Sequence, residues 1–176
     1  MIHRVFAVVA VVALLVVSSG CGSSTKTVTS TGANGQATTA TVPNVHFAKT
    51  KFVLHMGLAF GAFHRYIYKP FRAHAFSKGA PGRTKALVKA AAAGLFAVHE
   101  LKQANRDALS DDRLRPLAQK LDGLGGQLSG LASSLKGGAL NPGAIVGAAG
   151  AVKALGSQSG GAGAAIKDLP VPALGG

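Results

Sequence analysis

The sequence predicts an all-α fold, a small up-and-down bundle of three helices plus a weak fourth, which follows a disordered tether. Apolar residues recur at helical spacings of three and four through the middle of the chain. β-Branched residues, which favour strands, are scarce after Val53. Nine of the ten aromatic residues fall between residues 47 and 96, so only part of the 176-residue chain has the bulk to build a core. We therefore expect one helical domain over residues 46–156.

The first 24 residues have the pattern of an export signal. A short basic start, MIHR, precedes the 13-residue apolar run VFAVVAVVALLVV, which is long enough for a signal peptide and too short to span a bilayer comfortably. The run ends in Ser18-Ser19-Gly20-Cys21. These residues resemble the signal peptide and lipobox of a bacterial lipoprotein, with Ser18 at the position where Leu is usual. The resemblance implies that residues 1–20 are removed and that acylated Cys21 anchors the protein to the outer face of the bacterial cytoplasmic membrane.

Two other processing routes use the same residues. Ser18 and Gly20 provide the small side chains of an ordinary secretory cleavage site, and the apolar run can also remain as an uncleaved anchor. Cys21 is the only cysteine in the chain, so no internal disulfide can form. Acylation would use this thiol, and two acyl chains at about 0.8 kcal/mol per buried methylene hold a protein on a membrane. We therefore expect lipidation at Cys21.

The segments that flank the predicted domain have no apolar period. Residues 21–45 are rich in Ser, Thr, Gly and Ala, a composition typical of disordered linkers. We expect this segment to be a tether that keeps the domain near the headgroups. Residues 157–176 are rich in Gly, Ala and Pro, and we expect them to form a flexible tail.

The segment 52–68 is predicted to be the first helix of the bundle. Bulky apolar and aromatic side chains cover a wide arc of it, and a narrow stripe on the opposite side is basic. Pro70 is expected to end this helix, because proline has no backbone N–H. Gly57 and Gly61 lie one turn apart on a flank that another helix can approach closely.

Three further helices are predicted after the first. The second spans residues 84–109 and has a small-sided, Ala-rich centre that suits close packing. The third follows Ser110-Asp111-Asp112, which resembles a capped helix start with acids at its positive end. Asn141-Pro142 indicates the start of the weak fourth helix, which continues to about Leu155.

The predicted third helix has leucines in alternating steps of three and four, the pattern of a coiled-coil seam. We call this set the leucine seam: Leu114, Leu117, Leu121, Leu124, Leu128, Leu131 and Leu135. Four glycines in the same segment weaken the helix by roughly 1 kcal/mol each, so it needs a partner to persist. One functional hypothesis is therefore an interaction module that pairs through this seam with itself or with another protein.

The charged residues are unevenly distributed along the chain, whose formal net charge is +13. All six acids come from residue 100 onward, whereas nine Lys or Arg and no carboxylate lie between residues 49 and 89. Such a field attracts anionic lipid or an envelope polymer, and an exported protein is not expected to meet nucleic acid. The candidate contact residues are Arg65, Lys69, Arg72, Lys78, Arg83, Lys85 and Lys89.

No catalytic motif is present, so we expect a non-enzymatic protein without a cofactor. The stretch GSQSG at 156–160 lacks the serine of a nucleophile elbow. His55 and His64 lie on opposite sides of the predicted helix with no carboxylate nearby to orient them, so no metal site is expected. His64 lies near Phe60 on the apolar side, where it is the weak candidate for binding haem or another hydrophobic ligand. The alternative is a neutral histidine in the core or at its boundary, bonded to a backbone carbonyl.

Overall fold

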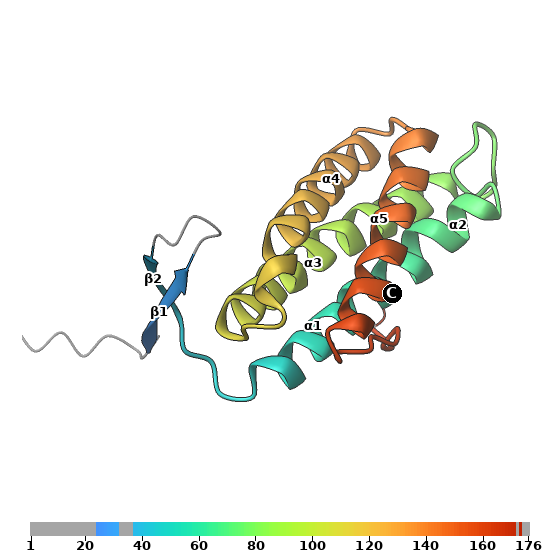
Figure 1. Ribbon diagram of the computed structural model, residues 1–176. Coiled ribbons are helices and arrows are strands. Elements are labelled where there is room, and N and C mark those ends of the chain that lie inside the picture. The colour runs from blue at the N-terminus through green and yellow to red at the C-terminus, as the bar shows by residue number, and fades with distance from the viewer. Residues whose placement is uncertain (1–23, 32–36, 172, 174–176) are drawn as a thin grey trace, which may run out of the picture.

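The computed structural model describes residues 24–31, 37–171 and 173, and in them the predicted all-α bundle is confirmed (Figure 1). The central helix α3 packs against both α1 and α4, and α5 packs against α4. The helix that was predicted to be weak, α5, is fully formed, and the Asn141 side chain caps it by accepting a hydrogen bond from the Ala144 N–H at 3.1 Å. The four long helices are α1 (Ala48–Phe63), α3 (Arg83–Ser110), α4 (Ala118–Lys136) and α5 (Pro142–Gly161).

The first helix continues past Pro70, so the prediction that it ends there is wrong. After α1 the chain makes a π-helical turn, η1 (His64–Tyr68), and proceeds directly into α2 (Lys69–Arg72). The Lys69 N–H donates to the His64 carbonyl, five residues back. In a regular α-helix, the ring of Pro70 would press on the carbonyl four residues earlier. The wider π turn relieves this conflict, so the helix continues to Arg72.

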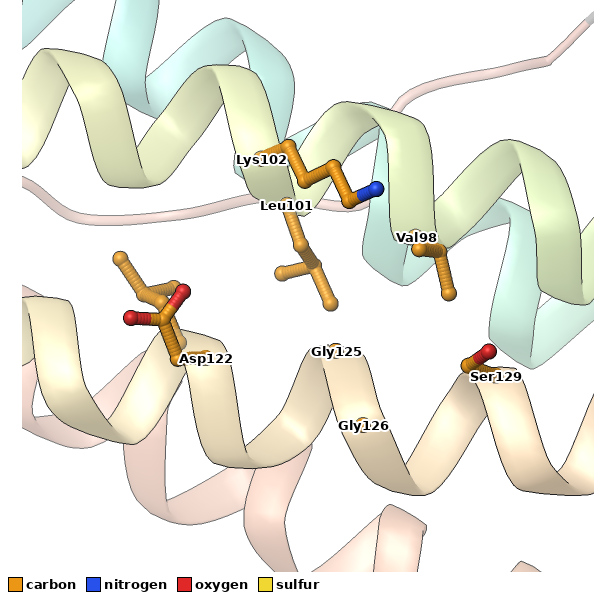
Figure 2. A pocket seen from close by; sticks show the side chains of 8 residues that line it. Val98, Leu101, Lys102, Asp122, Gly125, Gly126 and Ser129 are labelled. Atoms are coloured by element: carbon orange, nitrogen blue, oxygen red, sulfur yellow. The ribbon is translucent and has the colours of Figure 1, made fainter.

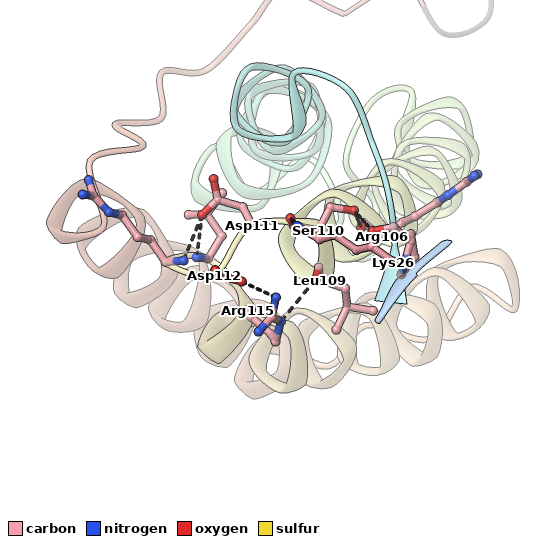
Figure 3. Close-up of polar contacts among 10 residues, drawn as sticks. Lys26, Arg106, Leu109, Ser110, Asp111, Asp112 and Arg115 are labelled. Atoms are coloured by element: carbon pink, nitrogen blue, oxygen red, sulfur yellow. Dashed lines mark hydrogen bonds and ion pairs between the residues drawn. The ribbon is translucent and has the colours of Figure 1, made fainter. Parts of the chain in front are cut away.

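The turn between α3 and α4 is capped by Asp111. Its carboxylate accepts hydrogen bonds from the N–H groups of Arg113, at 2.9 Å, and Leu114, at 3.3 Å (Figure 3). A 3-10 turn, η2 (Arg115–Leu117), then precedes α4. The next helix therefore begins a few residues later than the acidic pair alone indicated, because Pro116 suits a tight first turn.

The leucine seam packs inside the domain. Its seven side chains are between 0% and 6% exposed and belong to the same hydrophobic core as residues of α1, α3 and α5. Gly94 of α3 allows close contact with α4, since an added Cβ there would lie 2.9 Å from the Ala132 Cβ. The partner that the seam needs is thus supplied by the same chain, and these leucines present no open surface to a second protein.

The predicted disordered tether contains a β-hairpin, so that prediction is wrong for the described part of residues 25–43. Strands β1 (Thr25–Thr31) and β2 (Ala37–Pro43) pair antiparallel, with Thr25 opposite Pro43. The Ser110 hydroxyl donates to the Pro43 carbonyl at 2.6 Å, and the Lys26 ammonium donates to the Ser110 carbonyl at 2.6 Å (Figure 3). The high content of Thr, with one Val in each strand, favours strands, and the end of α3 offers a carbonyl without a helical partner.

The predicted flexible tail is also ordered over most of its length. The chain segment 162–171, here called the C-terminal strap, crosses α1, where the Leu169 N–H donates to the Gly57 carbonyl at 2.9 Å. A Cβ on Gly61 would overlap the Leu169 carbonyl oxygen. Ala164 and Val171 are 1% and 5% exposed. The two glycines therefore permit the close approach of an extended strap, where a helix had been expected.

Candidate functional site

One end of the bundle is basic, and the described segments that build it have no carboxylate. We call it the basic end: α2, the loop 73–82, the first turns of α3, and the connection from α4 to α5 (Figure 1). Residues 69–90 and 133–146, which build it, include no Asp or Glu. Most of its cations are exposed, with Lys89 partly buried, and Lys136 joins the predicted set because α4 runs antiparallel to α3 and ends here. The members with side chains available to a partner are Lys69, Arg72, Lys78, Lys85, Lys89 and Lys136.

Two predicted contact residues have distinct positions. Arg83 is partly buried, and its guanidinium donates to the Phe76 carbonyl and to the Gly138 carbonyl, both at 2.9 Å. It therefore ties the loop before α3 to the loop after α4, which is a structural role. Arg65 is exposed on η1, one turn before α2, and its guanidinium carbon lies 5.3 Å from the centre of the Tyr66 ring.

His55 lies between α1 and α3, next to two buried carboxylates. Its Nδ1 is 2.7 Å from Glu100 Oε2, and its Nε2 is 3.8 Å from Asp107 Oδ2. The carboxylate side chains are only 9% and 6% exposed. The prediction that no carboxylate orients this histidine is wrong. Glu100 is 45 residues away in the sequence, but the fold brings it to His55. A signal was present, because Glu100 and Asp107 are two turns apart and so share one face of α3.

Asp107 is the least satisfied member of this cluster. Its Oδ2 atom is buried and has no hydrogen-bond partner in the described part of the protein. Burial raises the pKa of Asp107, and the charges of His55, Lys51 and Arg106 oppose that rise. A cavity of about 430 Å³ beside it extends to the chain segment after the hairpin and is lined in part by Lys51, His55 and Arg106.

The three side chains of the His55 cluster are not arranged as a metal site. Glu100 and Asp107 lie next to different ring nitrogens, so the imidazole separates the two carboxylates. Across the described ranges, no group of three or more His, Cys, Asp or Glu side chains is placed to hold a metal ion. The bond to Glu100 instead fixes the orientation of the imidazole ring.

His64 lies at the surface and has its own carboxylate partner. Its Nδ1 is 2.6 Å from Oδ2 of Asp168 in the C-terminal strap, and the two side chains are 33% and 48% exposed. The ring lines a pocket of about 350 Å³ between α1, η1, α5 and the strap. His64 therefore does not point into the bundle core, as a histidine buried around a cofactor would, but forms part of a pocket rim.

A further groove runs between α3 and α4 (Figure 2). Gly125 and Gly126 of α4 leave it open opposite Val98 and Leu101 of α3. Its volume is about 200 Å³. Pockets for small molecules start at about 300 Å³, so this groove is too small to be the main site.

No protein-family model, curated protein or solved structure matches this chain. The predicted signal peptide and Cys21 lie outside the described residues. Within those residues, no helix combines the length and the apolar character needed to cross a membrane. Function must therefore be argued from the chemistry of the basic end and of the two histidine sites.

Proposed function

We propose that the protein is a non-enzymatic envelope lipoprotein, exported and acylated at Cys21, whose basic end binds an anionic polymer of the cell envelope. The observation that carries the proposal is the concentration of exposed cations at one end of the bundle, with no carboxylate in the segments that build it. Unopposed charges of one sign raise the local concentration of a polyanion and speed its association.

The position of the hairpin favours a polymer over the lipid headgroups. The hairpin is bonded to the last turn of α3, whereas the basic end surrounds the first turns of the same helix (Figure 1). The 28 residues of α3 span about 42 Å. Fields at a membrane surface decay over about 8–10 Å in physiological salt. Only a bundle that lies flat would bring its basic end within that range.

The short chain between the anchor and the hairpin supports the same choice. Only Gly22 and Ser23 lie between Cys21 and Ser24, so the three Cα-to-Cα steps span at most about 11 Å. The Asn44 N–H donates to the Ser24 carbonyl at 2.7 Å, so the described chain is tied down from Ser24 onward. With Cys21 acylated, the hairpin end therefore stays near the membrane, and an upright bundle holds its basic end about 42 Å farther out.

Binding of the mature chain, with Cys21→Ser to remove the acyl group, tests the proposal. The variant Lys69→Gln, Arg72→Gln, Lys78→Gln, Lys85→Gln should bind an immobilised polyphosphate-containing glycopolymer at least about tenfold more weakly at 50 mM salt. A matched control removes the same charge elsewhere, through Lys102→Gln, Arg113→Gln, Lys120→Gln and Lys167→Gln, and should retain most of the affinity.

Vesicles distinguish the two possible anionic partners. The chain should bind the polymer more tightly than vesicles with anionic headgroups, and neutral vesicles should not bind it. Equal loss of polymer affinity in both quadruple variants would show that net charge alone matters and would reject the basic end. Tighter binding to anionic vesicles, lost in the first variant only, would reassign the same surface to lipid.

A further inference from the structure

We propose that the pocket beside His64 binds a single-chain amphiphile with an anionic head, such as a medium-chain carboxylate. Lys153 and Tyr68 would hold the head, and the apolar floor would hold the chain. This proposal is independent of the basic end, since the pocket lies between η1, α5 and the C-terminal strap.

The floor of the pocket is apolar and is kept open by a glycine. Phe60 and Val152 line it and belong to the core, at 5% and 3% exposed, and Ile166 adds a wall from the strap. A Cβ added to Gly156 would lie 3.6 Å from the Phe60 ring, in ordinary contact. A larger side chain at this position would therefore occupy the space. The volume of about 350 Å³ lies within the range of about 300–1,000 Å³ that is usual for small-molecule sites.

The rim has polar groups that suit an anion. Lys153 is exposed and takes part in none of the ion pairs found among the described residues. Asp168 is not among the residues that line the pocket, and its carboxylate is bonded to the His64 Nδ1 at 2.6 Å. A cationic head would therefore meet an uncompensated ammonium, whereas a carboxylate would pair with it.

The walls are fixed before any ligand binds. The strap is bonded to α1 at Gly57 and to η1 through the Asp168–His64 pair, which together hold Ile166 in place. Tyr68 stacks on Phe63, with ring centres 6.2 Å apart, and packs edge-on against His64, with ring centres 6.0 Å apart. His64 and Tyr68 both come from the π-helical turn, a distortion that often occurs at functional sites. A preformed pocket loses little conformational entropy on binding.

Calorimetric titration of the mature Cys21→Ser chain with n-decanoate, below the concentration at which it forms micelles, tests the pocket. Gly156→Leu fills the pocket and should weaken binding by about tenfold or more, since it displaces several methylenes. Gly150→Leu is the matched control, because it lies on the same helix with open space around its Cβ position. It should bind decanoate as the parent chain does.

A second variant tests the head group. Lys153→Gln should weaken decanoate binding by about fivefold, the scale of one exposed ion pair, and should leave binding of uncharged n-decanol unchanged. No binding by a chain that retains its helical circular dichroism would overturn the proposal, as would equal affinities for the Gly156→Leu and parent chains. Equal effects of Lys153→Gln on decanoate and decanol would overturn the assignment of the anionic head.

Discussion

His55 and His64 lie on one continuous helix, and each has its Nδ1 atom paired with a carboxylate oxygen at nearly the same distance, 2.7 Å and 2.6 Å. Their surroundings differ. The partner of His55, Glu100, is 9% exposed, whereas the partner of His64, Asp168, is 48% exposed. Water screens the second pair and can solvate either member if the other is removed. The comparison teaches that burial, more than distance, decides what such a pair contributes to stability.

The largest expected effect comes from removing the buried partner. Glu100→Ala should lower the free energy of unfolding by about 2 kcal/mol at neutral pH, because it leaves the Nδ1 of His55 without its hydrogen-bond partner. Glu100→Gln should lose less, since an amide oxygen still accepts a hydrogen bond. Urea unfolding followed by circular dichroism measures both values. A loss below about 1 kcal/mol for Glu100→Ala would mean that water reaches the pair and that the two histidine sites are equivalent.

An intermediate effect of opposite sign is expected at Asp107. Because burial raises the pKa of Asp107 in the folded state, its favourable contribution is complete below the unfolded pKa and is lost as the pH rises through the folded pKa. Asp107→Asn cannot ionise, so it should raise the free energy of unfolding by about 1 kcal/mol at pH 7 and have a smaller effect at pH 4. Melting temperatures at the two pH values measure this difference.

Asp112 provides the control for that pH dependence. It is exposed near the same end of α3, so Asp112→Asn should show no comparable gain at pH 7. A destabilised Asp107→Asn variant at pH 7 would indicate that the ionised carboxylate is needed by His55.

The smallest effect is expected at the exposed pair. Asp168→Ala should cost about 0.5 kcal/mol in low salt, and most of that cost should disappear in 1 M salt, where exposed charges are screened. The cost of Glu100→Ala should persist in the same salt. Denaturant unfolding at both salt concentrations provides the test. A salt-resistant loss above about 2 kcal/mol at Asp168 would show that this pair secures the whole strap.

The four long helices were predictable because their signal is local. The steps of three and four in the leucine seam indicate a buried helix face without knowledge of any partner. The strap and the hairpin depend on distant backbone bonds, such as Leu169 to Gly57 and Ser110 to Pro43. The hairpin and the strap have a low-complexity composition without an apolar period, and such a composition predicts a linker.

The same difference between local signals and distant contacts explains which parts of the candidate sites could be predicted. The charges of residues 69–90 could be predicted because they are read directly from the sequence, but Lys136 joins the basic end only because α4 runs antiparallel to α3. The carboxylate partners of the histidines could not be predicted. Asp168 follows His64 by 104 residues and meets it only because the strap folds across α1. The sequence does not predict the π turn, because proline usually ends or kinks a helix. Proline also permits a widened turn when the helices around it hold the chain in line.

If Cys21 is acylated as proposed, the attachment of the hairpin to α3 has a mechanical consequence. Ser24 and Asn44 lie side by side, and Thr25 is opposite Pro43, so a pull from the anchor acts on the open end of the ladder. Load applied there separates the strand pairs one after another and does not shear them all at once. The 19 residues from Thr25 to Pro43 would then extend to about 65 Å while the helical bundle stays folded. The hairpin thus holds a reserve of length that tension can release and that refolding can recover.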